Sequence, residues 1–264
     1  MRNTARVLRY AFASAMADLR ATYTWKSWGL AWLLRMLFQV TLFAFVGKLI
    51  GDPRVVEYLV IGNSVFIIAD VVMLVCASTS WERMSGTLPL LVASPAAPFT
   101  VFTGRSVQWL LDGLACSTIS LLVLPQFLGV QLPLGTRLAV VPLIAVIAVS
   151  VYFFGLVLGG LALRAMAARN LIGRVGSIGL MLLTGVQVPV SFWPSPLESL
   201  AQLLPLTHGL GAVRAALGNG SASDVLRGIA LEIVVGIGWA LVAAFTYWRL
   251  VESGRRDGTI EFGG

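Results

Sequence analysis

Long apolar runs, separated by short polar breaks, make up most of the chain. Six of them have roughly the 20 residues that an α-helix needs to cross a hydrocarbon core about 30 Å thick. They lack the roughly ten-residue alternation of apolar and polar positions that marks a membrane β-strand. Because a lipid-exposed backbone must satisfy its own hydrogen bonds, such runs are expected to be helices. The pattern predicts an all-α membrane protein with six transmembrane helices, at about 32–50, 57–78, 107–129, 138–163, 171–189 and 226–248.

Residues 1–27 precede the first run and combine apolar positions at helical spacing with several arginines. The arginines lie toward one side of such a helix, and the other side carries Leu8, Phe12, Ala15, Leu19 and Tyr23. This pattern favours an amphipathic helix in the cytosolic membrane interface, with its basic side on anionic lipid headgroups. No uninterrupted apolar stretch precedes Asp18, which argues against a signal peptide. A mitochondrial presequence is the main alternative.

The break between the second and third runs, residues 79–106, contains a short helical pattern of its own. Apolar residues fall on one side of it, at Met84, Leu88, Leu91 and Val92. Thr87 is placed to cap this helix, and Pro89 falls in its first turn, where a missing N–H is tolerated. Ser94 and Pro95 end it, so it has only one or two turns and is marginal alone. We therefore expect it to dock, either on the inner ends of the spans or in a groove on another protein.

Residues 190–225, between the fifth and sixth runs, predict two short helices. The first ends at a break at Pro205, and the second begins near Thr207 and ends near Gly218. Broken helices of this kind are tolerated at membrane depth only where they pack on protein. We therefore expect two short helices on the outer side of the membrane, packed on the rest of the protein. The polar residues 249–264 are expected to form a cytosolic tail.

Composition and charge agree with a membrane protein and orient it. Hydrophobic residues make up 58% of the chain and charged residues only 12%, where a soluble domain has about 25%. An even number of spans places both termini on one side. If that side is the cytosol, it receives 14 of the 19 lysines and arginines, as the positive-inside rule requires, so the net charge of +7 does not indicate a nucleic acid partner. The outer side keeps Lys48, Arg54, Arg137, Arg214 and Arg227.

The sequence lacks the motifs of enzymes and of metal sites. It has no G-x-x-x-x-G-K-[ST] phosphate loop, so energy from ATP would require another polypeptide. It has no H-E-x-x-H, C-x-x-C or G-x-S-x-G, and the single histidine, His208, has no cysteine or second histidine nearby. Cys76 and Cys116 both fall in apolar runs. We therefore expect no catalytic residue and no cofactor or metal bound by this chain.

Three ionisable residues stand out within the predicted spans, where burial of a charge is costly: Arg35, Asp70 and Asp112. Such residues are candidates for a transport path. Arg35 can also snorkel to headgroups, and Asp112 can form a structural pair with Arg105 or Arg35. Asp70 has no local partner in the sequence, so a wet cavity or transport path and a structural pair are both open. Asp70 and Asp112 together would also suit a proton relay.

The loop between the second and third spans carries the pattern E-x-x-x-G-T-L-x-x-L-x-x-S-P. It is formed by Glu82, Gly86, Thr87, Leu88, Leu91, Ser94 and Pro95. This pattern resembles the coupling loop of the bacterial type-two ABC exporter permeases. Residues 189–220 resemble the family's outer segment between its fifth and sixth spans, which implies two short re-entrant helices there. One position departs from the family, which commonly has an acidic residue where this chain has Pro89.

The resemblance implies a permease subunit in the bacterial plasma (inner) membrane, with both termini in the cytosol. Two such protomers, identical or paralogous, would enclose a path lined mainly by the first, second and fifth spans. A pair of ABC ATPase subunits, which carry ATP and Mg, would dock on the coupling loop. Glu82 and Arg83 would be polar contacts to the ATPase. Leu88 and Leu91 would fill its groove.

The expected function is ATP-driven export of a drug-like, peptide or lipid-like amphiphile. The aromatic residues, 10% of the chain, form no dense stacking lane for sugars. Within the family, export of a polysaccharide or lipid-linked glycan is the nearest alternative. Outside the family, a proton-coupled secondary transporter using Asp70 and Asp112 would need no ATPase partner.

Overall fold

A computed structural model describes residues 2–84, 86, 98–218 and 220–257 of the chain. Within these ranges all regular secondary structure is helical, which confirms the all-α class. Five helical stretches are long and apolar enough to cross a membrane. They are Trp25–Ile50, Pro53–Trp81, Phe99–Leu128, Leu134–Arg164 and Ala222–Ser253.

The first two spans form a helical hairpin with a two-residue turn. The first span consists, in order, of α2 (Trp25–Ser27), the π-helical turn η1 (Trp28–Leu33) and α3 (Leu34–Ile50). It ends because Gly51 takes a left-handed conformation, with a φ of +82°. Asp52 Oδ1 then accepts the N–H of Arg54 at 2.8 Å and caps the next helix. Pro53 opens that helix, where the N–H it lacks is not needed.

The second span is the central helix of the bundle. It consists of α4 (Pro53–Val72) and α5 (Leu74–Met84), which meet at a turn at Met73. Most residues of α4 are buried, against α3, α7 (Pro98–Leu128) and α9 (Val141–Arg164). In a bilayer, close van der Waals packing holds helices together. The other elements are therefore placed around α4.

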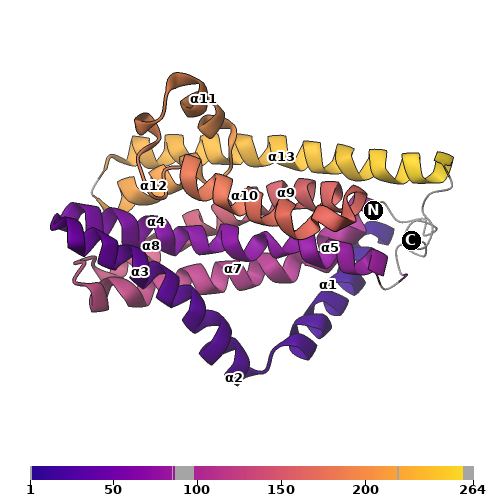
Figure 1. The fold of residues 1–264 in the computed structure, drawn as a ribbon, viewed down its shortest axis with the longest axis horizontal. Coiled ribbons are helices and arrows are strands. Elements are labelled where there is room, and N and C mark those ends of the chain that lie inside the picture. The colour runs from indigo at the N-terminus through magenta and orange to yellow at the C-terminus, as the bar shows by residue number, and fades with distance from the viewer. Residues whose placement is uncertain (1, 85, 87–97, 219, 258–264) are drawn as a thin grey trace.

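The remaining elements complete the bundle and its two ends. They are, in chain order, α8 (Leu134–Ala139), η2 (Met166–Ala168), α10 (Arg169–Leu183), η3 (Val190–Phe192), α11 (Ser195–Leu203), α12 (Thr207–Leu217) and α13 (Ala222–Asp257). Figure 1 shows α13 along the outside of the bundle, with its C-terminal part near the start of α1 (Arg2–Thr22). The beginning of α1 and the end of α13 thus lie at the same end of the molecule.

The predicted fifth span, 171–189, is helical over a shorter range. α10 has 15 residues, which rise about 22 Å, less than a hydrocarbon core of about 30 Å. It packs beside α9 and α5. The helix ends at Leu183. Bends follow over 184–188, where Gly185 has a φ of +86°. Helix length therefore supports five spans among the described residues, and the sixth stays a prediction.

α1 packs along α7 rather than standing apart from the bundle. Ala11 and Ala15 are buried, and the Arg105 guanidinium lies 3.7 Å from the Asp18 carboxylate. Phe12, which was expected on the same side as Ala15, is 44% exposed. The helix is present, and its position in the membrane interface stays a prediction. The re-entry of α11 and α12 into the membrane also stays a prediction.

Candidate functional site

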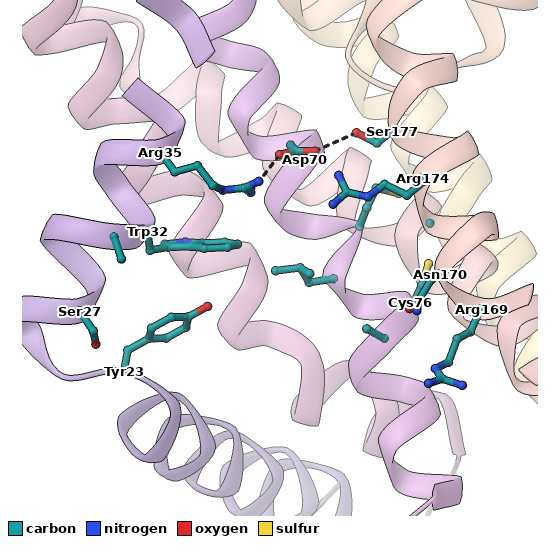
Figure 2. A pocket seen from close by; sticks show the side chains of 15 residues that line it. Tyr23, Ser27, Trp32, Arg35, Asp70, Cys76, Arg169, Asn170, Arg174 and Ser177 are labelled. Carbon is teal, nitrogen blue, oxygen red and sulfur yellow. Dashed lines mark hydrogen bonds and ion pairs between the residues drawn. The ribbon is translucent and has the colours of Figure 1, made fainter. Parts of the chain in front are cut away.

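A cavity of about 740 Å³ lies between the first span, the second span and α10. Figure 2 shows side chains from these elements around one space. The lining residues come from three short ranges, 23–35, 70–77 and 169–177. The first, second and fifth apolar runs of the sequence therefore meet at this cavity.

The wall contributed by α10 follows from helical spacing. Its lining residues recur at intervals of one, three, one and three, and so share one face: Arg169, Asn170, Gly173, Arg174 and Ser177. Gly176 lets α10 lie close to α9, because a methyl group at this position would overlap Leu158. α10 thereby turns a polar face toward the cavity.

The wall contributed by the N-terminal region is aromatic. The ring centroids of Tyr23 and Trp32 are 5.8 Å apart. The Arg35 guanidinium lies 5.0 Å from the Trp32 ring centroid, which is a cation–π distance. Burial raises the pKa of Tyr23, and the nearby Asp112 carboxylate acts in the same direction. Tyr23 therefore keeps its hydroxyl proton at neutral pH.

Asp70 has a partner within the cavity. Its Oδ2 lies 3.6 Å from Nη2 of Arg35, and its Oδ1 accepts a hydrogen bond from Ser177 Oγ at 3.1 Å (Figure 2). The side chain of Asp70 is 12% exposed and that of Arg35 is 50% exposed. The structure thus brings together two of the three predicted path residues. Asp70 both lines the cavity and forms an ion pair, and its part in a transport path stays a prediction.

Asp112, the third predicted path residue, lies behind the cavity wall rather than among the lining residues. Its Oδ1 accepts a hydrogen bond from Trp28 Nε1 at 2.7 Å, and its Oδ2 accepts one from Trp32 Nε1 at 2.8 Å. These indole donors satisfy a carboxylate that is almost fully buried. Because Trp32 also lines the cavity, Asp112 fixes one of its walls from behind.

The predicted ion pair between Asp112 and Arg105 or Arg35 is not formed. Neither Arg105 nor Arg35 pairs with it, because Arg35 lies beside Asp70 and Arg105 lies beside Asp18. About two turns of α7, some 10 Å of rise, separate Arg105 from Asp112 along the same helix. α1 brings the carboxylate of Asp18 within reach of Arg105 instead.

Two further arginines line the cavity that the sequence analysis did not single out, Arg169 and Arg174. Nη1 of Arg169 donates to the carbonyl oxygen of Met166 at 3.3 Å. Arg174 makes no hydrogen bond or ion pair with any residue that the structure describes. The sequence analysis counted these arginines only among the cations that predict the orientation of the chain in the membrane. The polar face of α10, read at helical spacing, was the signal that could have placed Arg174.

Most of the predicted coupling residues lie outside the described residues, namely Thr87, Leu88, Leu91, Ser94 and Pro95. Glu82 and Arg83 belong to the last turn of α5, whose first residues line the cavity. Gly86 has a φ of +69°, a left-handed conformation that glycine adopts without strain. One helix therefore connects the cavity wall with the start of the predicted coupling loop.

A buried carboxylate that the sequence analysis missed holds the start of α12. Glu232, fully buried in α13, accepts the backbone N–H groups of Leu206 and Gly209, each at 2.9 Å. The first N–H groups of a helix have no partner within it and favour a negative charge. A glutamate inside the apolar run 226–248 was the signal that could have revealed this contact.

Arg214, which the sequence analysis counted only among the cations of the outer side, connects α12 to two other segments through polar contacts. Its Nη1 donates to the carbonyl oxygen of Gly185 at 2.7 Å, and its Nη2 donates to that of Tyr58 at 3.2 Å. The guanidinium also lies 3.6 Å from the Tyr58 ring centroid. Polar contacts from α12 thus connect the outer segment to the second span and to the residues that follow α10.

Comparison with known protein families identifies the chain. The family model of ABC-2 type transporters matches residues 14–217, a range that includes the cavity, the loop after α5 and α12. A search of curated proteins found no match. The membrane domain of this family is the permease part of a transporter and has no ATPase site of its own. The chain therefore belongs to the ABC-2 type transporter family, as a multi-pass membrane permease.

Proposed function

We propose that this permease is the membrane-spanning subunit of an ATP-driven exporter that moves a drug-like, peptide or lipid-like amphiphile out of the cytosol. The observation that carries the proposal is the cavity between the first span, the second span and α10. Its lining combines aromatic groups, Tyr23 and Trp32, with the charged groups of Arg35 and Asp70. An apolar site with a few polar groups suits the binding of an amphiphile. A separate pair of ABC ATPase subunits, carrying ATP and Mg, supplies the energy.

α5 is the element through which the ATPase acts on the cavity in this proposal. Its first residues line the cavity, and Glu82 and Arg83 lie in its last turn. Met73, where α4 and α5 meet, also lines the cavity, so a change of angle there alters the cavity wall. Closure of the ATPase pair moves the loop at 82–95 and biases two arrangements of the spans.

In the proposed exporter, two permease protomers, identical or paralogous, enclose the path. The first span leaves large apolar side chains such as Leu42 and Leu49 exposed, and faces of this kind mark contacts with lipid or with a partner. Both termini lie in the cytosol of a bacterial cell. This orientation places Arg169 and Arg174 on the inner side of the plasma membrane, in keeping with the positive-inside rule.

Co-purification from native cells tests the proposal. The chain is extracted in mild detergent, its companions are identified by mass spectrometry, and ATP hydrolysis by the eluate is measured. We expect a stoichiometric partner with a phosphate-binding loop. Leu88→Asp and Leu91→Asp should each abolish the complex, because a carboxylate in an apolar groove is buried without a partner. The permease should still insert into the membrane.

Ala167→Asp is the matched control for these variants. It adds the same charge to an exposed position in η2, outside the coupling loop, so the yield of the complex should not change. An unchanged yield for both leucine variants would exclude docking through this loop. If the chain purifies alone and no ATP is hydrolysed, the exporter proposal fails, and Asp70 and Asp112 return as candidates for proton coupling.

A further inference from the structure

We propose that the cavity binds the anionic head of an amphiphile, a phosphate or a carboxylate, between the guanidinium groups of Arg35 and Arg174. The inference rests on the proposed export function, because it names the chemical class of the molecule that would be carried. Three features support it: the charge of the lining, the free donors of its arginines and the apolar wall beside them.

The lining carries an excess of positive charge. Arg35, Arg169 and Arg174 line the cavity together with one carboxylate, that of Asp70, which gives these residues a net charge of +2. Asp70 pairs with Arg35 and with neither of the other two arginines. An anionic ligand would supply the missing counter-charge.

The arginines of the cavity have donors to spare. Nη2 of Arg35 lies 3.6 Å from Asp70, farther than the roughly 2.7–2.9 Å of a close charge-assisted hydrogen bond. Arg174 has no partner in the described part of the chain, and Figure 2 shows its side chain extending from α10 toward the side of Asp70 and Arg35. A guanidinium presents five N–H donors in a planar fork that fits the oxygens of a phosphate or carboxylate. Two such groups on facing walls form a site for one anionic head.

An apolar wall continues beside the arginines. Trp32, Met73 and Leu74 line the same cavity and pack on the hydrophobic core. The volume of about 740 Å³ lies within the range of about 300–1,000 Å³ found for pockets that bind small molecules. It accommodates a charged head and the adjoining part of an apolar tail. The lining therefore fits an anionic amphiphile better than an unattached anion.

Asp70 sets the strength of this site. The head of the ligand must compete with Asp70 for Arg35. Asp70→Asn removes the competitor and raises the net charge of the lining, so the variant should bind the anion more tightly. Arg174→Ala removes an unpaired donor group and should bind it more weakly. A purely structural Arg35–Asp70 pair would not produce shifts of opposite sign.

Binding of radiolabelled decyl phosphate to the full chain tests the proposal. The chain is placed in phosphatidylcholine nanodiscs, and empty nanodiscs correct for partition into lipid. We expect saturable binding to the wild type, about tenfold weaker binding to Arg174→Ala and severalfold tighter binding to Asp70→Asn. Arg54→Ala is the matched control, because Arg54 is exposed and does not line the cavity, and it should bind as the wild type does. Thermal unfolding verifies that each variant is folded.

Competition assigns the source of the anion. Displacement of decyl phosphate by millimolar inorganic phosphate would show that the head alone is recognised, which supports the site. Displacement when phosphatidylglycerol replaces part of the phosphatidylcholine would assign the site to a membrane lipid. Equal binding by the wild type and folded Arg174→Ala would overturn the proposal, and so would a preference for decyltrimethylammonium. The assay needs neither ATP nor a partner, so its failure is distinct from a failure of the export proposal.

Discussion

The carboxylate of Glu232 shows how a single residue can be buried in an apolar span at a tolerable cost. Burial of a lone carboxylate is unfavourable by several kcal/mol or more. Here its two oxygens each accept a backbone N–H from the start of α12. Glu232 thereby replaces the water that would otherwise bind the first turn of α12.

Removal of this carboxylate should loosen α12. Glu232→Ala leaves the N–H groups of Leu206 and Gly209 without an acceptor, and we expect a loss of about 2–4 kcal/mol in the free energy of unfolding. Glu232→Gln keeps one oxygen acceptor and should lose less. Denaturant unfolding of the detergent-solubilised chain measures both. Glu198→Ala, on α11, is a control with an expected change near zero, and equal losses for all three variants would contradict the assignment.

At the scale of elements, the first span is held to the bundle by polar contacts at its start. Thr24 caps α2 through a reciprocal pair of hydrogen bonds with Ser27. The π-helical turn η1 follows, and such turns are frequent at functional sites. The indoles of Trp28 and Trp32, in this turn, reach Asp112 on α7. The first span is therefore attached to the third through one carboxylate.

Trp28→Phe tests this attachment without changing the cavity lining, because Trp28 does not line the cavity. The variant keeps an aromatic ring and removes one donor to Asp112, so we expect a loss of about 1.5–3 kcal/mol in the free energy of unfolding. When Trp28→Phe is made in the Asp112→Ala variant, the further loss in the free energy of unfolding should be much smaller, because the acceptor is already absent. Trp25→Phe, at an exposed position, is the matched control. Additive effects of Trp28→Phe and Asp112→Ala would show that the hydrogen bond is not formed in solution.

The short α10 bears on the topology of the whole molecule. In the described part of the chain, five helical stretches have the length of a span, and this number alone would place the termini on opposite sides of the membrane. α10 and the residues after it nevertheless lead from η2 to the start of α13, and Figure 1 shows α10 running along the bundle. If this segment crosses the membrane, the number of crossings is even and both termini lie on the same side.

Accessibility of engineered cysteines decides between these topologies. Ala167 lies in η2, before α10, Ala222 is the first residue of α13, and both positions are exposed. A membrane-impermeant maleimide applied to intact cells should label Ala222→Cys, and should label Ala167→Cys only after the membrane is opened. The natural thiols of Cys76 and Cys116 are buried and give little background. Labelling of both positions from the same side would contradict the sixth crossing.

Local features of the fold could be predicted from the sequence, because they depend on neighbouring residues. The helix class follows from the apolar runs, and the turn at Gly51 and Asp52 follows from a left-handed glycine and a capping carboxylate. The early end of α10 was missed, because Val186 and Val188 extend the apolar run to Pro189. Periodicity therefore gives the kind of element better than its limits.

The cavity was only partly predictable, because it depends on which helix faces meet. Burial cost alone pointed to Arg35, Asp70 and Asp112 as residues to examine. The partners of Asp112 lie 80 and 84 residues away in the sequence, and Ser177 reaches Asp70 from another helix. Pairings of this kind are set by packing around α4, which no local pattern encodes.

The turn at Met73 also has a geometric consequence for mechanical transmission. The 11 residues of α5 make a rod about 16 Å long beyond this turn. If the rod pivots at Met73 by about 10°, simple trigonometry on that length moves its far end by about 3 Å. Side chains one turn from the pivot move by only about 1 Å. A pivot at Met73 would therefore convert a large displacement at the far end of α5 into a small displacement of the cavity wall.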